Sequence, residues 1–304
     1  AEHVDREQVA PAVGDPNPPP GDPIAPPLSG DAPRVGVVGL GYDGLPLAVT
    51  FGEAGVPVLG LDAVQAKVDR VNAGESYIED VASDRLAPLV REGTVRAPTS
   101  WDALRAVDAI LICLPTPLTE HREPDLSAVL GAAESLSQRL RPGHLVVLES
   151  TTYPGTTREA MLPVYGLAEN SVALARSGLR AGRDFHLAFS PERVDPGRVD
   201  WTTATTPKVI GGLTPACTRR AMEVYGLACE TLVPVGSPEV AELTKLLENI
   251  FRSVNIALVN ELAMLCDRMD IDVWDVIDAA ASKPFGYMPF YPGPGLGGHC
   301  IPID

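Results

Sequence analysis

The sequence predicts an α/β protein in which a doubly wound parallel sheet is followed by an all-helical domain with one long helix. Short apolar runs alternate with helical segments up to about residue 212, which is typical of a parallel sheet with helices on both faces. Residues 239–269 then carry a helical pattern without glycine or proline. We expect three parts: a disordered proline-rich tail over 1–32, a sheet domain over 33–212 and a helical domain over 213–304.

Composition limits the partners and the location of the protein. The 304 residues carry a formal net charge of −16, which disfavours nucleic acid and anionic membranes as partners. No apolar run approaches the ~18 residues of a membrane-spanning helix, and the N-terminus lacks the apolar core of a signal peptide. The cysteines show no metal-site or disulfide spacing: Cys113, Cys217, Cys229, Cys266 and Cys300. We therefore expect a cytoplasmic protein without a bound metal.

A glycine-rich turn lies between the first predicted strand, residues 35–39, and a helix over residues 45–54. The turn reads Gly39-Leu40-Gly41-Tyr42-Asp43-Gly44, and a second strand over residues 56–61 ends at Asp62. This order of strand, GxGxxG turn, helix, strand and acid is the fingerprint of a Rossmann-type dinucleotide-binding unit. The alternative is a glycine turn without a ligand.

Each part of this unit has a mechanical role in binding a dinucleotide. Gly39 permits the tight turn, Gly41 lets the backbone approach a pyrophosphate, and Gly44 lets the helix pack closely on the strand. The helix N-terminus offers N–H groups and a partial positive charge to the phosphates. Asp62 follows Gly44 by 18 residues, where a carboxylate binds ribose hydroxyls and repels a 2′-phosphate. The sequence therefore predicts NAD rather than NADP as the cofactor.

Polar residues follow three later strands. These strands are predicted over residues 109–114, 145–148 and 185–189. They lead into Thr116, Thr151 and Glu192, and ligands in such sheets bind beyond the carboxyl ends of the strands. We therefore expect the three side chains to converge on one cleft. Alternatively, the threonines satisfy turn backbone, and Glu192 is a surface acid beside Arg193.

The long helix carries a candidate pair of hydrogen-bond donors. Its apolar residues recur on several sides, so we expect it to be central or shared with a second subunit. Lys245 and Asn249 lie one turn apart on one face, where they are able to stabilise an oxyanion. Alternatively, Lys245 pairs with Glu242 or Glu248. A shorter helix over residues 272–282 follows.

The last residues form a glycine-rich loop around a cysteine. The segment reads Gly293-Pro294-Gly295-Leu296-Gly297-Gly298-His299-Cys300-Ile301-Pro302-Ile303-Asp304. The glycines clear the backbone for a ligand, the prolines restrict it, and a thiol beside such a loop is a candidate nucleophile. The alternative is a surface turn with an unreactive, buried cysteine.

Together these motifs resemble those of the nucleotide-sugar 6-dehydrogenases, the family of UDP-glucose and GDP-mannose dehydrogenases. The resemblance covers residues 34–304 and is closest to the branch that acts on UDP-N-acetylhexosamines. The motifs that carry it are Gly39-Leu40-Gly41-Tyr42 with Gly44, Cys113-Leu114-Pro115-Thr116-Pro117, Glu149-Ser150-Thr151, Ser190-Pro191-Glu192-Arg193-Val194, Lys245 with Asn249, and Gly297-Gly298-His299-Cys300-Ile301-Pro302-Ile303-Asp304.

The resemblance implies oxidation of the C6 hydroxymethyl group of a UDP-sugar to a uronic acid for polysaccharide precursors, with two NAD consumed. UDP-N-acetylglucosamine or UDP-N-acetylmannosamine is the favoured substrate. Cys300 would hold the intermediate as a thiohemiacetal and then a thioester. Lys245 and Asn249 would stabilise the oxyanion, and Glu192 would act as general base through a water held by Thr151.

The resemblance also implies binding roles and a homodimer through the long helix. Asp304 would position Lys245 or a water. The implied cofactor contacts are Gly39, Leu40, Gly41, Tyr42, Asp43, Gly44, Asp62, Lys67, Pro115, Thr116 and Thr151. The implied substrate contacts are Glu192, Arg193, Lys245, Asn249, Tyr291, Gly295 and Gly297.

Three features depart from the family pattern. Asp43 stands where the family usually has valine, and a carboxylate there is expected to repel the cofactor pyrophosphate. Some relatives carry a second glutamate at the position of Pro196. The chain stops at Asp304, before the family's C-terminal nucleotide-binding domain, and has no initiator Met. We therefore expect part of a longer protein that turns over poorly alone.

Other functions stay open at this point. They are a UDP-glucose 6-dehydrogenase, a β-hydroxyacid-type dehydrogenase that needs a lysine but no thiol, and a non-catalytic NAD-binding or dimerisation module. Replacing Cys300 by serine separates the first two, because it stops a second oxidation but leaves a hydroxyacid enzyme active.

Overall fold

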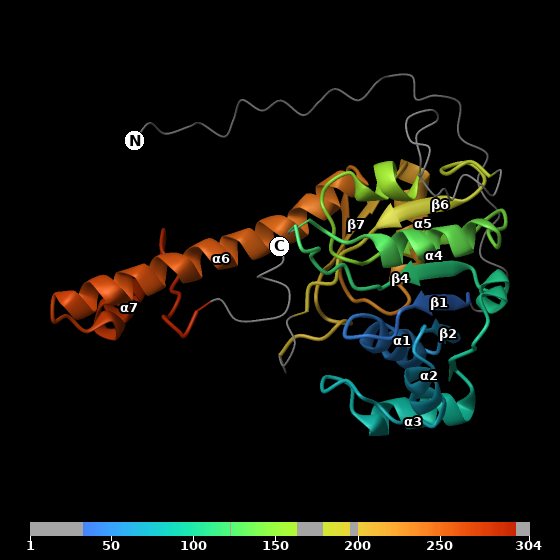
Figure 1. Cartoon of the computed structure of the whole chain (residues 1–304), viewed down its shortest axis with the longest axis horizontal. Coiled ribbons are helices and arrows are strands. Elements are labelled where there is room, and N and C mark those ends of the chain that lie inside the picture. Colours follow the sequence, from blue (N-terminus) through green and yellow to red (C-terminus); the bar gives the residue numbers. More distant parts are fainter. Residues whose placement is uncertain (1–32, 122, 163–178, 195–199, 296–304) are drawn as a thin grey trace, which may run out of the picture.

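The computed structural model of the chain describes residues 33–121, 123–162, 179–194 and 200–295. Within these ranges, helices cover both faces of an eight-stranded sheet, and one long helix leads away from it (Figure 1). The predicted α/β class with a helical second part is therefore confirmed. The predicted tail over residues 1–32 lies outside the described residues.

The strands lie in the order β3-β2-β1-β4-β5-β6-β7-β8. Their bounds are β1 Val35–Val38, β2 Val58–Leu61, β3 Val95–Arg96, β4 Ala109–Ile112, β5 Leu145–Leu148, β6 His186–Phe189, β7 Lys208–Gly212 and β8 Leu232–Val235. Every residue of β1, β4, β5 and β6 is buried, as expected for central strands that are covered on both faces. The short apolar runs of the sequence are therefore the core strands of the sheet.

One pairing among the described strands departs from the predicted parallel sheet: β6 and β7 are antiparallel, and β8 runs parallel to β7. The described residues between β6 and β7, which are 190–194 and 200–207, form no helix. Antiparallel neighbours need no crossover helix between them. As a result, the first residue of β7 lies at the sheet edge where β1, β4, β5 and β6 end.

The helices divide between the two faces of the sheet. The helical residues of one buried cluster come from α1 (Gly44–Glu53), α2 (Gln65–Asn72), α3 (Ser83–Glu92) and α5 (Pro215–Tyr225). Those of the other come from the 3-10 helix η2 (Trp101–Ala106), α4 (Ser127–Ser137), the π-helical turn η3 (Thr156–Met161) and the start of α6 (Pro238–Arg268). Both α5 and β8 follow residue 212, where the sequence predicts the end of the first domain, so the sheet continues past that point.

The long helix α6 crosses one face of the sheet and then extends beyond it (Figure 1). Ser237 is its N-cap, and the hydroxyl of this serine accepts a hydrogen bond from Val240 N. The shorter helix α7 (Val273–Ala281) packs against the outer end of α6. None of the described helices combines the length and the apolar character needed to cross a bilayer.

Candidate active site

The glycine turn has the geometry that its sequence predicts. Gly39 has a φ of +95°, and a Cβ atom there would lie 2.3 Å from the carbonyl oxygen of Cys113. A Cβ atom on Gly44 would lie 1.8 Å from the carbonyl oxygen of Gly39. Around Gly41, no other described atom comes within 4 Å of an added Cβ. The turn is therefore compact on its inner side and open at Gly41, where a pyrophosphate would approach the backbone.

Asp62, at the end of β2, ties this turn to the sheet. Its Oδ2 atom accepts a hydrogen bond from Leu40 N at 2.9 Å, and its Oδ1 atom accepts one from Val64 N at 2.9 Å. Lys67 Nζ lies 3.5 Å from Asp62 Oδ2, and the Tyr77 hydroxyl donates to Leu40 O at 2.6 Å. The predicted ribose-binding carboxylate and Lys67 are thus neighbours beside the turn, and the residues present fit an NAD molecule.

Tyr42 and Asp43 lie on the exposed side of the turn. Asp43 is the N-cap residue of α1, and its side chain makes no capping hydrogen bond. Tyr42 is 63% exposed. A negative charge therefore stands at the helix N-terminus that would receive the phosphates, which is the relationship that the sequence predicts to weaken NAD binding.

The loops after β4 and β5 are hydrogen-bonded to each other. Thr116 Oγ1 donates to Thr151 O at 2.6 Å, and Ser150 Oγ accepts from Leu114 N at 3.0 Å. Thr116 and Thr151, expected on one cleft, are therefore in contact, and Pro115 lies between the two bonded residues of its loop. The Thr116 hydroxyl therefore satisfies a backbone carbonyl of a turn, which is the alternative role considered for the threonines.

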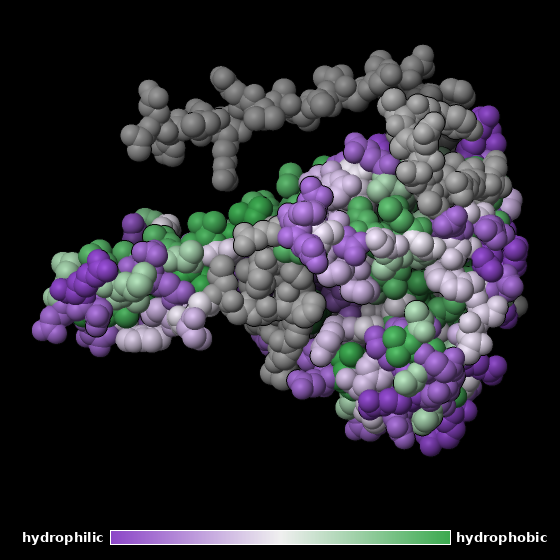
Figure 2. Space-filling view, viewed as in Figure 1, coloured by the Kyte–Doolittle hydropathy of each residue, from purple (hydrophilic) through white to green (hydrophobic). Residues whose placement is uncertain are grey.

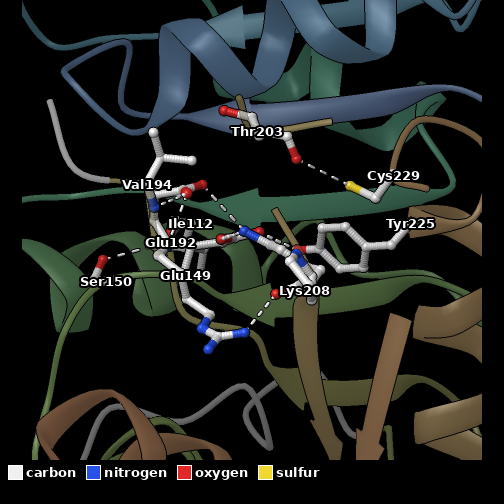
Figure 3. A network of polar contacts seen from close by, with 11 residues as sticks. Ile112, Glu149, Ser150, Glu192, Val194, Thr203, Lys208, Tyr225 and Cys229 are labelled. Atoms are coloured by element: carbon white, nitrogen blue, oxygen red, sulfur yellow. Dashed lines mark hydrogen bonds and ion pairs between the residues drawn. The ribbon is translucent and has the colours of Figure 1, made fainter. Parts of the chain in front are cut away.

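Glu192 follows β6 and is held through both carboxylate oxygens. Its Oε1 atom accepts hydrogen bonds from Arg193 N at 2.8 Å and Val194 N at 2.9 Å. Its Oε2 atom lies 3.2 Å from Lys208 Nζ, at the start of β7 (Figure 3). Burial raises the pKa of Glu192, but Lys208 and the two backbone N–H groups outweigh it, so the pKa lies below its usual range.

Lys208 also binds a second, more deeply buried carboxylate. Its Nζ atom lies 2.6 Å from Glu149 Oε2, and the Tyr225 hydroxyl donates to Glu149 Oε1. Glu149, Lys208 and Tyr225 are 1%, 2% and 0% exposed. Burial raises the pKa of Glu149 to about 7, with Lys208 opposing. The sequence motif identified Glu149 only as part of a cofactor segment, and neither Lys208 nor Tyr225 was predicted.

The loop that carries Glu192 is anchored on α6. Arg193 Nη2 lies 2.5 Å from Glu248 Oε1, Arg193 Nε lies 3.3 Å from Glu248 Oε2, and Arg193 Nη1 donates to Pro207 O at 2.7 Å. Glu248 is one residue before Asn249 and three after Lys245. The structure therefore brings the glutamate loop to the stretch of α6 that bears the predicted donor pair.

The donor pair itself differs in burial: Asn249 is 3% exposed, whereas Lys245 is half-buried. The alternative partners of Lys245 bind other groups. Glu248 binds Arg193, and Glu242 accepts hydrogen bonds from Gly155 N and from both donors of Thr157. Among the described ion pairs, neither carboxylate is matched with Lys245.

The predicted substrate residues at the end of the chain are only partly described. Tyr291 stacks on Trp274 with ring centroids 5.9 Å apart, and its hydroxyl lies 3.1 Å from Asp278 Oδ1, so it packs on α7. Gly293 N donates to Asn260 Oδ1 at 3.0 Å, eleven residues beyond Asn249 on α6. Gly295 is exposed, with a φ of +136°. Gly297, Cys300 and Asp304 lie outside the described residues, as does Pro196.

The sheet with its glycine turn and the helix α6 together define a class of proteins in which a dinucleotide-binding α/β domain precedes a long helix. The family model for the NAD binding domain of the UDP-glucose/GDP-mannose dehydrogenase family matches residues 33–228, and the model for its central domain matches residues 239–304. The chain therefore belongs to the UDP-glucose/GDP-mannose dehydrogenase family, as the motifs predict, and NAD is the cofactor of its first domain.

Similar proteins extend beyond the matched region. UDP-N-acetyl-D-mannosamine dehydrogenase of Salmonella typhi is 38% identical over 270 residues, which cover 89% of this chain and 63% of the relative. NDP-N-acetyl-D-galactosaminuronic acid dehydrogenase of Ralstonia solanacearum is 38% identical over 275 residues, covering 90% and 64%. The solved UDP-D-ManNAc dehydrogenase of Pyrococcus horikoshii superimposes with a TM-score of 0.80 at 34% identity, covering 88% and 62%. The chain thus spans less than two thirds of these relatives.

Proposed function

We propose that the protein oxidises the C6 hydroxymethyl group of a UDP-sugar to a carboxylate and consumes two NAD and one water per sugar. UDP-N-acetylmannosamine or UDP-N-acetylglucosamine is the proposed substrate, and the product is a uronic acid for polysaccharide precursors. Family membership supports the reaction class. The names of the relatives in Salmonella typhi and Pyrococcus horikoshii support an N-acetylated sugar.

The observation that carries this proposal is the docking of the Glu192 loop on α6. The ion pair between Arg193 and Glu248 fixes a carboxylate of the sheet domain next to the helix turn that bears Lys245 and Asn249. An acid near two hydrogen-bond donors supplies the groups that alcohol oxidation followed by hydrolysis requires of the chain.

The proposed chemistry assigns one role to each group. NAD, when bound, accepts the hydride that leaves C6 in each oxidation. After the first oxidation, the thiolate of Cys300 adds to the aldehyde carbon, and the new C–S bond retains the intermediate. Lys245 and Asn249 donate hydrogen bonds to the oxygen on that carbon, and the Lys245 ammonium favours the thiolate. Asp304 positions Lys245 or the hydrolytic water.

Loss of the second hydride from the carbon bonded to Cys300 converts the thiohemiacetal into a thioester. Hydrolysis of this thioester is assigned to Glu192. A general base must be ionised at the working pH, and the lowered pKa of Glu192 meets this requirement. The base takes a proton from water, the oxygen of that water attacks the thioester carbon, and the C–S bond breaks to release the Cys300 thiol and the sugar carboxylate. Thr151, on the loop after β5, is proposed to hold that water.

We also propose that a second copy of the chain covers α6. Large apolar side chains along this helix are exposed, among them Leu247 at 63%, Val254 at 60% and Leu258 at 55% (Figure 2). An apolar groove of about 200 Å³ lies between α6, α7 and residues 287–290. Contiguous apolar surface of this kind marks an interface. In sedimentation experiments, Leu258→Arg should be monomeric, whereas Asp267→Arg, at an exposed position on the opposite side of α6 from Leu258, should be dimeric. A monomeric wild type contradicts the proposal.

The decisive experiment is the number of NADH molecules formed per sugar consumed. It uses the full-length protein with NAD and, in parallel, UDP-N-acetylmannosamine, UDP-N-acetylglucosamine and UDP-glucose. A ratio of two supports the four-electron reaction, and the fastest sugar identifies the substrate. A ratio of one favours a single-step dehydrogenase such as the β-hydroxyacid type. No NADH from the full-length protein with any sugar leaves an NAD-binding or dimerisation module. Cys300→Ser should stop the second oxidation, and Glu192→Gln should stop release of the acid.

A further inference from the structure

A buried ammonium group lies between two carboxylates at the carboxyl edge of the sheet. Lys208 Nζ is 2.6 Å from Glu149 Oε2 and 3.2 Å from Glu192 Oε2 (Figure 3). The antiparallel pairing of β6 with β7 places Lys208 at this edge. Phe189 is opposite Gly211, and the same register continued by three residues brings Glu192 opposite Lys208. In a fully parallel sheet, the first residue of β7 would lie at the opposite edge.

Other ionisable groups face this ammonium from the neighbouring elements. The Tyr225 hydroxyl on α5 donates a hydrogen bond to Glu149, and the Tyr225 ring centroid is 5.6 Å from Lys208 Nζ. Cys229, after α5, donates to Thr203 O at 3.8 Å, and Cys113 lies at the end of β4. Burial raises the pKa of both thiols, so they are neutral at pH 7. Among the described side chains of this cluster, Lys208 therefore supplies the positive charge that contacts the Glu192 carboxylate.

The charge balance of the cluster favours an ionised Glu192. Burial opposes the charge on Lys208, but the two carboxylates outweigh it and raise the pKa of this lysine, so it stays charged. Of the two carboxylates, Glu149 is the one that takes up a proton first, since its pKa is raised to about 7. Below that pH, Glu149 is mostly protonated, and Lys208 and Glu192 form an ion pair without net charge.

We propose that Lys208 is a positioning residue that holds the Glu192 carboxylate ionised and fixed in orientation. This inference rests on the proposed role of Glu192 as the base. Two backbone N–H groups fix Oε1, and the ammonium fixes Oε2. An opposite charge within hydrogen-bond distance lowers the pKa of a carboxyl by about 1–3. Without Lys208, Glu192 would keep its backbone contacts and lose the charge that opposes its protonation.

The test is a titration of the glutamate side-chain carboxyls by ¹³C NMR in the full-length protein, with the Glu192 signal assigned by its loss in Glu192→Gln. In the wild type, Glu192 should titrate below the usual glutamate range. Lys208→Met should raise its pKa by about 1 or more. Lys208→Arg, which keeps the charge, should restore the low pKa. The matched control is Lys283→Met, because Lys283 is exposed at the end of α7 and should leave Glu192 unchanged.

A second variant covers the case in which Lys208→Met does not fold. The double variant Lys208→Met/Glu149→Gln removes both members of the buried pair and leaves no unpaired buried charge at position 149; the same rise in the pKa of Glu192 is expected. An unchanged pKa of Glu192 in the variant that folds would overturn the proposal.

Turnover provides an independent readout. If Glu192 is the base, Lys208→Met should move the acid limb of the kcat profile to higher pH by the same amount as the NMR pKa and leave the KM for the sugar within about twofold. A shifted NMR pKa with an unmoved acid limb overturns the positioning role. Retention of wild-type turnover by Glu192→Gln overturns the proposed function instead, so the two failures are distinguishable.

Discussion

Glu242 and Thr157 are 85 positions apart in the sequence and are joined by two hydrogen bonds to one carboxylate oxygen. Glu242 Oε1 accepts from Thr157 N at 2.9 Å and from Thr157 Oγ1 at 2.7 Å, and Glu242 Oε2 accepts from Gly155 N at 2.6 Å. The N-cap of η3 is Gly155, which has no side chain to cap it. A carboxylate from α6 therefore satisfies the N-terminus of η3.

Replacing Glu242 with alanine should destabilise the protein strongly. The side chain is 0% exposed, and its removal leaves three buried donors without an acceptor, so we expect the free energy of unfolding to fall by about 2–4 kcal/mol. Glu239→Gln is the matched control, because its ion pair with Arg158 is partly exposed and should cost at most about 1 kcal/mol. Urea unfolding measures both, and equal losses would contradict the capping role.

Removing the charge of Asp43 should strengthen NAD binding. Its carboxylate stands at the N-cap of α1, and repulsion between two unit charges at close range in water costs about 1 kcal/mol. Asp43→Asn should therefore lower the Kd for NAD roughly threefold to fivefold. Asp84→Asn, in the first turn of α3, is the control with the same chemistry and should leave the Kd unchanged. Calorimetric titration with NAD at low salt decides, and equal Kd values for Asp43→Asn and wild type would refute the repulsion.

His144 should make stability depend on pH. Burial, followed by Arg141, lowers its pKa from 6.5 to about 4. Between these two values the unfolded chain binds a proton that the folded chain does not, so the free energy of unfolding falls as the pH drops from 6.5 to 4. The full loss is about 3 kcal/mol.

The His144 contribution is measured by comparison with His144→Asn, whose side-chain oxygen is able to accept the hydrogen bond from Arg141 N. The difference in unfolding free energy between the wild type and this variant should be constant above about pH 6.5. As the pH falls toward 4, the wild type should become less stable relative to the variant. Glu149 has a raised pKa and the opposite slope, but it is present in both proteins and cancels. A difference that does not change with pH would show that His144 titrates normally.

The cysteines should differ widely in reactivity. Burial raises the pKa of Cys229 to about 11 and that of Cys113 well above its usual value, so both are almost entirely protonated at pH 7.5. If Cys300 is the nucleophile, iodoacetamide should label it at least roughly tenfold faster than either. Peptide mass spectrometry gives the rates, and urea should make them equal. Labelling of Cys113 in the folded protein at the rate of Cys300 would count against this assignment.

Much of the sheet was predictable because its central strands are short, apolar and buried on both faces. The strand predicted over residues 145–148 is β5, Leu145–Leu148, and the turn from Gly39 to Gly44 follows β1 as predicted. In contrast, α2 was not predicted, since it is mostly polar and buries only Val68 and Val71. β8 was missed because it contains Pro234 and lacks a buried residue.

The missed part of the candidate site follows from one topological feature. A lysine directly before an apolar run looks like a charge at the exposed start of a strand, which is the common case. No local pattern in the sequence records that β7 runs antiparallel to β6. Lys208 was therefore invisible in the sequence, although its partners Glu149 and Glu192 both stood in recognised motifs.

The two anchors on α6 make the helix a spacer of fixed length. Glu242 holds η3 and Glu248 holds Arg193, and the six residues from one to the other rise about 9 Å along the axis. Inserting or deleting one residue between them would rotate one anchor by about 100° relative to the other. At least one of the two contacts would therefore be lost. This interval of α6 tolerates substitution far better than any change in length.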